Sequence, residues 1–90
     1  MNKKIIIESL AMDLKRTALG LHRGSLFMAQ RFREEALKRE KELEGQKTDG
    51  YLKILLSNTK KILKSYNKKD AEDILMYSTL FQNYSQRKFK

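Results

Sequence analysis

An apolar stripe with helical spacing runs through the first half of the chain, from Ile7 to Leu43. When residues are placed about 100° apart, as on an α-helix, the members of the stripe fall on one face. They are Ile7, Leu10, Ala11, Leu14, Ala18, Leu21, Ser25, Met28, Ala29, Phe32, Ala36 and Leu43. The stripe keeps its phase across "GLHRGS" (20–25), where the only helix breakers are Gly20 and Gly24. Because two helices joined by a turn would keep phase only by chance, the pattern favours one helix over residues 3–44.

The two glycines keep a second interpretation open. Each glycine inside a helix costs ~1 kcal/mol relative to alanine, which a packed helix can tolerate. A turn at residues 20–24 would instead close the chain into an antiparallel four-helix bundle. Both interpretations are all-α with a single domain over residues 1–90, and we take a long N-terminal helix followed by a C-terminal helical hairpin as the prediction.

Two loops divide the second half of the chain. "EGQKTDG" (44–50) offers Gly45 as a C-cap and Thr48 or Asp49 as an N-cap, and "YNKKD" (66–70) offers Asn67 as a cap. We therefore expect helices over residues 50–66 and 70–86, with a basic, frayed tail at 87–90. The expected core faces are Leu52, Leu55, Thr59, Ile62, Leu63 and Tyr66 in the first helix, and Ile74, Tyr77, Phe81 and Tyr84 in the second.

The predicted lengths imply a partner. A helix over 3–44 would be roughly 63 Å long and each later helix about 25 Å, so the hairpin would cover only half of it. An apolar stripe left in water usually marks an interface, here with a larger protein or a second copy of the chain. The predicted interface residues are Ile7, Leu10, Leu14 and Leu21, with a second seam of Met12, Leu19 and Leu26.

Positive charge is concentrated in one predicted helix. The chain has 20 Lys and Arg against 11 Asp and Glu, a net charge of +9, and residues 51–69 contain lysines but no acid. Lysines along one side of a helix are typical of contacts with a nucleic-acid backbone. A face that only keeps a protein soluble usually mixes charges of both signs. The candidate nucleic-acid-binding residues are Lys53, Lys60, Lys61, Lys64 and Lys68.

Catalysis has little support in the sequence. His22 is the only histidine and cysteine is absent, so one chain assembles neither a histidine-based nor a thiolate metal site. Arg16 and His22 have an Arg-x5-His spacing that resembles helical ribonucleases of the HEPN type, but on a helix they lie about 120° apart. We expect no catalytic residue, no metal and no cofactor.

The remaining expectations concern location and function. The absence of cysteine suits a reducing compartment, and the apolar run of residues 5–7 is short for a signal or membrane segment, so we expect a cytoplasmic protein without membrane contact. The first hypothesis is a non-enzymatic accessory subunit of a nucleic-acid-handling complex. It would bind DNA or RNA without sequence preference and would have no small-molecule substrate. The alternatives are a homodimeric helical adaptor or regulator and, more remotely, a helical ribonuclease.

Overall fold

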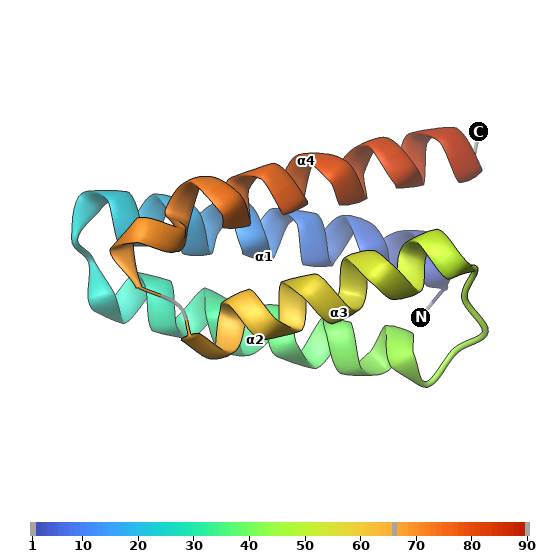
Figure 1. Ribbon diagram of the computed structural model, residues 1–90, viewed down its shortest axis with the longest axis horizontal. Helices are drawn as coiled ribbons and strands as arrows, with labels where there is room; N and C mark the ends of the chain where they lie inside the picture. The colour runs from blue at the N-terminus through green and yellow to red at the C-terminus, as the bar shows by residue number, and fades with distance from the viewer. Residues whose placement is uncertain (1, 66, 90) are drawn as a thin grey trace.

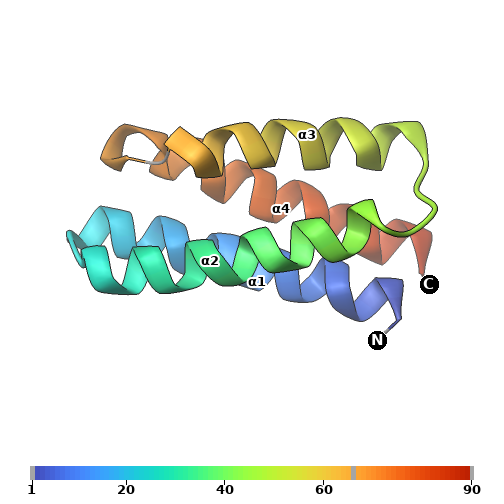
Figure 2. The ribbon, with the colours of Figure 1, turned by 90° about the horizontal axis from the view of Figure 1, so that it is seen from below.

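The computed structural model describes residues 2–65 and 67–89, which form an antiparallel helical bundle (Figures 1 and 2). The helices are α1 (Lys3–Arg23), α2 (Leu26–Glu44), α3 (Gly50–Ser65) and α4 (Ala71–Lys88), with a 3-10 turn η1 (Lys68–Asp70) before α4. None of the described residues lies in a strand, so the predicted all-α class is confirmed. The start of α1 and the end of α4 lie at the same end of the bundle.

The predicted continuous helix over residues 3–44 is wrong, and the alternative with a turn at residues 20–24 is the observed fold. Gly24 has φ 73°, in the left-handed region that favours glycine. Its N–H donates to the carbonyl of Leu21 (3.2 Å), and the N–H of Ser25 donates to the carbonyl of Gly20 (2.9 Å). This pair of hydrogen bonds is a Schellman motif, which ends α1 and lets α2 fold back beside it.

The turn also explains why the interface prediction fails for the main stripe. With α2 and α4 both packed along α1, residues Ile7, Leu10 and Leu14 are 0% exposed and Leu21 is 3% exposed. These four residues belong to the hydrophobic core of the bundle and do not form an exposed interface. In the second seam Leu19 is half-buried, whereas Met12 and Leu26 are 46% and 70% exposed.

The core runs along the bundle axis between the four helices. α3 lies diagonally across from α1 and packs against α2 and α4. The largest fully buried apolar side chains are Ile6, Ile7, Leu10, Leu14, Leu43, Leu52, Leu63, Ile74 and Phe81. The expected core faces of the later helices are confirmed for the described residues, with Ile62 and Tyr77 only half-buried; Tyr66 lies outside the described residues.

Local capping signals were also correct. Gly45 is the C-cap of α2, and the side chain of Asp49 accepts the N–H of Leu52 (2.8 Å) at the start of α3. Asn67 and Asp70 form a reciprocal capping box around η1. The expected frayed tail is shorter than predicted, because α4 continues through Arg87 and Lys88; Lys90 lies outside the described residues.

Candidate nucleic-acid interface

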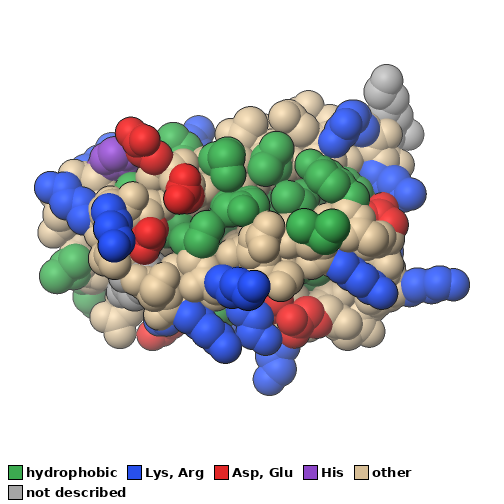
Figure 3. All heavy atoms as spheres, viewed as in Figure 1, with side chains coloured by type: hydrophobic (Ala, Val, Ile, Leu, Met, Phe, Trp, Pro, Cys, Tyr) green, Lys and Arg blue, Asp and Glu red, His purple; other side chains and the backbone are tan. Residues whose placement is uncertain are grey.

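The lysines of α3 lie on the side of the helix that points away from the core. Lys53, Lys61 and Lys64 are exposed and Lys60 is half-buried. Figure 3 shows Lys and Arg side chains gathered along the lower edge of the view, below α3. Because the buried leucines fix the rotation of α3, these ammonium groups are held on one side of a rigid helix. Lys68 is exposed on η1, which follows α3 and contacts α4 and α1, so the structure does not join it to the other four lysines.

A hollow of about 570 Å³ lies beside this face, between the end of α2, the loop that follows it, and α3. Three of its lining residues are lysines: Lys53 and Lys60 from α3, and Lys47 from the loop. The other lining residues are Glu44, Gln46, Thr48, Leu56 and Ser57. The Lys60 ammonium lies 3.5 Å from the Glu44 carboxylate, which makes Glu44 the acidic group of the hollow. Three lysines against one glutamate leave the lining with a net charge of +2.

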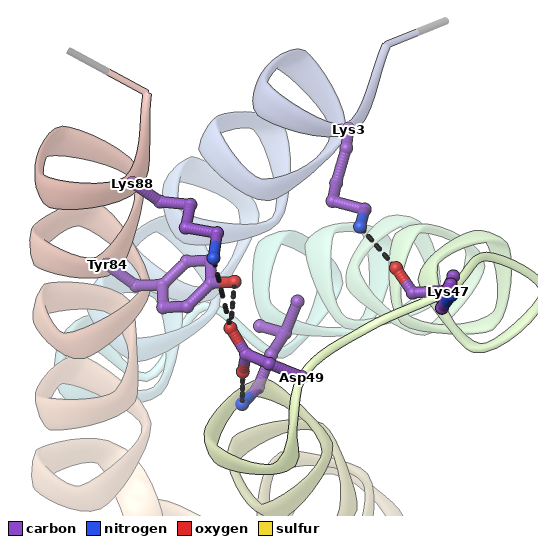
Figure 4. Close-up of polar contacts among 6 residues, drawn as sticks. Lys3, Lys47, Asp49, Tyr84 and Lys88 are labelled. Carbon is purple, nitrogen blue, oxygen red and sulfur yellow. Dashed lines mark hydrogen bonds and ion pairs between the residues drawn. The ribbon is translucent and has the colours of Figure 1, made fainter.

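The loop that carries Lys47 is anchored at two points (Figure 4). Upstream, the Lys3 ammonium of α1 donates a hydrogen bond to the Lys47 carbonyl. Downstream, the Tyr84 hydroxyl of α4 donates to Asp49 Oδ2 (2.7 Å), and the Lys88 ammonium lies 3.9 Å from the same oxygen. These contacts tie the loop to the first and last helices and so hold Lys47 beside α3.

The hydrogen bonds at Asp49 also set its charge. The N–H of Leu52 and then the hydroxyl of Tyr84 stabilise the carboxylate, so they hold the pKa of Asp49 below its usual value. Burial, followed by the same hydrogen bond, raises the pKa of Tyr84 to about 12. At neutral pH the carboxylate is therefore ionised and the phenol is protonated, as the hydrogen bond requires.

A buried carboxyl group lies one turn before Glu44 on α2. Glu40 of α2 is 1% exposed, and burial first, then its hydrogen bond to Glu44, raises its pKa to about 7. Lys60 and Lys64 of α3 oppose this shift. The same hydrogen bond lowers the pKa of Glu44, so as the pH rises Glu44 loses its proton before Glu40 does. The Glu40 Oε1 atom has no hydrogen-bond partner among the described residues.

Sequence reasoning found the α3 lysines but missed Lys47, Glu44 and Glu40. Lys47 and Glu44 join the site from other elements, through the path of a loop. Glu40 carries a charged side chain, a type that is rarely fully buried. A signal for it does exist in the sequence, because Glu40 lies four residues after Ala36 and three before Leu43, on the buried side of α2.

The structure does not bring Arg16 and His22 together. Both lie on the continuous helix α1, where six residues of separation turn them about 120° apart. The Arg16 guanidinium lies 5.2 Å from the ring centroid of Phe32, and His22 is exposed in the last turn. The described residues contain no group of three or more His, Cys, Asp or Glu side chains arranged for a metal ion.

Comparisons with known proteins add no function to this geometry. No protein-family model matches the chain, no curated protein is significantly similar in sequence, and no solved structure is significantly similar in fold. Among the described residues, no helix is both long and apolar enough to cross a bilayer.

Proposed function

We propose that the protein is a non-enzymatic accessory subunit that contacts the phosphate backbone of DNA or RNA through the lysines of α3. The observation that carries this proposal is the one-sided display of Lys53, Lys60, Lys61 and Lys64, with no acid in residues 51–69. Lys47, which lines the same hollow as Lys53 and Lys60, adds a fifth positive charge beside them.

The mechanism is electrostatic. Each phosphate that a lysine neutralises releases condensed counterions, so binding gains free energy at low salt whatever the base sequence. A lysine ammonium acts as a point charge with no fixed plane of donors, which suits backbone contact better than base recognition. The attachment of α3 to the core means that its backbone needs no ordering on binding, so the entropic cost is confined to the lysine side chains.

The test is the salt dependence of binding to DNA and RNA duplexes and single strands, measured by fluorescence anisotropy. Replacing Lys60, Lys61 and Lys64 together by Gln should weaken binding to every sequence similarly. It should also flatten the slope of log affinity against log salt by roughly 2 to 3, since each lost contact removes ~0.7–0.9. Circular dichroism and thermal melting would confirm that the variant, which also loses the ion pair between Lys60 and Glu44, stays folded.

A matched control variant removes three lysine charges from α1 and α2 instead of α3. Lys4 and Lys15 of α1 and Lys38 of α2 are exposed and lie outside α3 and its hollow, so their triple Gln variant should retain the wild-type slope. Equal effects of the two triple variants would mean that only net charge matters. Undetectable binding of the wild type at low salt would favour the alternative, a helical adaptor whose lysines only keep it soluble.

A further inference from the structure

One side of α4 carries a short heptad pattern that the four-helix bundle does not use fully. Asp73, Tyr77, Leu80, Tyr84 and Arg87 follow each other at spacings of four, three, four and three residues. On a helix they lie within about 80° of one another, which is the spacing of residues that face a second helix. The two charged residues are at the ends of the pattern: Asp73 is at its N-terminal end and Arg87 at its C-terminal end.

The middle of this side of α4 is apolar and partly open to solvent. Tyr77 and Leu80 are half-buried and pack against the core from its edge, while Met76 beside them is 47% exposed. Asp73 and Arg87 are exposed, and neither forms an ion pair with another described residue. The heptad pattern therefore has half-buried apolar residues in its middle and exposed charged residues at its two ends.

The neighbouring side of α3 extends the same surface. The Tyr51 ring lies 6.1 Å, centroid to centroid, from that of Tyr84, and Tyr51 is 44% exposed. Ile54, one turn further along α3, is 60% exposed and lies at about the level of Leu80, because α3 and α4 are antiparallel. Figure 3 shows the resulting patch of hydrophobic side chains across the middle of this face, between α3 and α4.

We propose that this patch binds a second copy of the chain across a two-fold axis near Leu80, with the two α4 helices antiparallel. Leu80 is seven residues from both Asp73 and Arg87. Antiparallel pairing about Leu80 therefore places Asp73 of each chain opposite the partner's Arg87, so one patch is complementary to itself. Parallel pairing would instead oppose like charges at both ends.

Lys53 and Lys60 lie away from this pairing. Lys60 is directed to Glu44 of α2, and Lys53 lines the hollow on that same side of α3, whereas the Tyr51 ring packs against that of Tyr84 in α4. Lys61, seven residues after Ile54, lies on the same side of α3 as Ile54, about 10 Å further along the helix. The two-fold axis also brings Ile54 close to the partner's Ile54. An isoleucine that is 60% exposed in the single chain is then covered in the dimer.

Sedimentation velocity across a wide range of protein concentration tests the proposal. The wild type should sediment as a dimer that dissociates on dilution. Ile54→Glu should give a folded monomer, because it opposes two carboxylates near the axis. Phe27→Glu is the control: Phe27 is 81% exposed near the turn between α1 and α2, and its replacement should leave the dimer unchanged.

Charge exchange tests the antiparallel register. Asp73→Arg alone and Arg87→Asp alone each oppose like charges twice, and each should weaken dimerisation by about tenfold or more. The double variant restores both pairs and should return dimerisation toward the wild-type value, although it keeps both helix-end changes. A wild-type monomer at every concentration, a dimer insensitive to Ile54→Glu, or a double variant as weak as the singles would overturn the proposal. These measurements need no nucleic acid, so they are independent of the lysine-face proposal.

Discussion

Gly20 of α1 packs directly against the backbone of Ala29 of α2 in the N-terminal hairpin. A Cβ built on Gly20 would lie 2.7 Å from the amide nitrogen of Ala29 and 3.1 Å from its Cβ. Both neighbouring groups are held in α2, which packs along much of α1. Glycine is therefore required at position 20 by space, although its backbone is helical.

Gly20→Ala should destabilise the fold. Alanine gains ~1 kcal/mol of helix propensity, but displacing a packed helix backbone typically costs about 1–3 kcal/mol. We expect a net loss of about 1 kcal/mol in the free energy of unfolding, measured by urea denaturation. Gly50→Ala is the matched control, because a Cβ there has no neighbour within 4 Å and the change should be neutral or stabilising. Equal stabilisation by both would contradict the close approach.

Gly24→Ala should destabilise the fold for a different reason. A Cβ on Gly24 meets nothing within 4 Å, so the cost arises from its φ of 73° alone. Placing an L-residue in the left-handed region costs roughly 1–2 kcal/mol, and asparagine tolerates it better than alanine. Thermal melting should rank wild type above Gly24→Asn and Gly24→Ala last. A stabilised Gly24→Ala variant would restore the continuous-helix interpretation.

These two glycines show where prediction from the sequence ended. Helical periodicity and the caps at Asp49 and Asn67 are local, and they gave the helices after residue 44 with nearly correct bounds. The phase of the N-terminal stripe did not distinguish one helix from two, because both helices of a hairpin turn a face toward the same core. The distinguishing fact, the contact between Gly20 and Ala29, depends on tertiary packing.

In the candidate site, too, some residues could be predicted from local sequence pattern and others are placed by tertiary contacts. The lysine side of α3 follows from the spacing of its leucines, so it could be predicted from one helix alone. Lys47 is brought beside it by a loop that Lys3 and Tyr84 help to hold, and those contacts join residues far apart in the chain. Glu40 is buried on the side of α2 that carries Ala36 and Leu43, so its spacing indicates the position although its charge does not.

The hydrogen bond from Tyr84 to Asp49 should couple α4 to the loop before α3. Tyr84→Phe and Asp49→Ala should each lower stability, and a double-mutant cycle should give a coupling free energy of about 0.5–1.5 kcal/mol. The value is modest because the Asp49 side chain is 41% exposed. Tyr51→Phe, which removes a hydroxyl with no hydrogen-bond partner among the described residues, is the control. Additive effects of the two changes would show that the bond contributes nothing.

Glu40 should make stability fall as the pH rises from about 4.5 to about 7. Its pKa is near 4.5 in the unfolded chain and about 7 in the folded one, so the folded state binds the proton more tightly across this window. Above the window the fold must hold a buried carboxylate, which is unfavourable. The raised pKa of Asp13, also caused mainly by burial, acts in the same direction. The lowered pKa of Glu44 acts at lower pH, where its protonation removes stability.

Glu40→Gln should remove most of this pH dependence. Glutamine keeps a donor for the Glu44 carboxylate without an ionisable group, so the variant should be more stable than the wild type at pH 8 by about 1–3 kcal/mol. At pH 5, where Glu40 is protonated in the fold, the two proteins should differ little. Urea denaturation at both pH values measures the difference, with Glu34→Gln, an exposed change on the same helix, as the control. A variant that is less stable than the wild type at pH 8 would mean that the ionised Glu40 is favourable in the fold, through its attraction to Lys60 and Lys64.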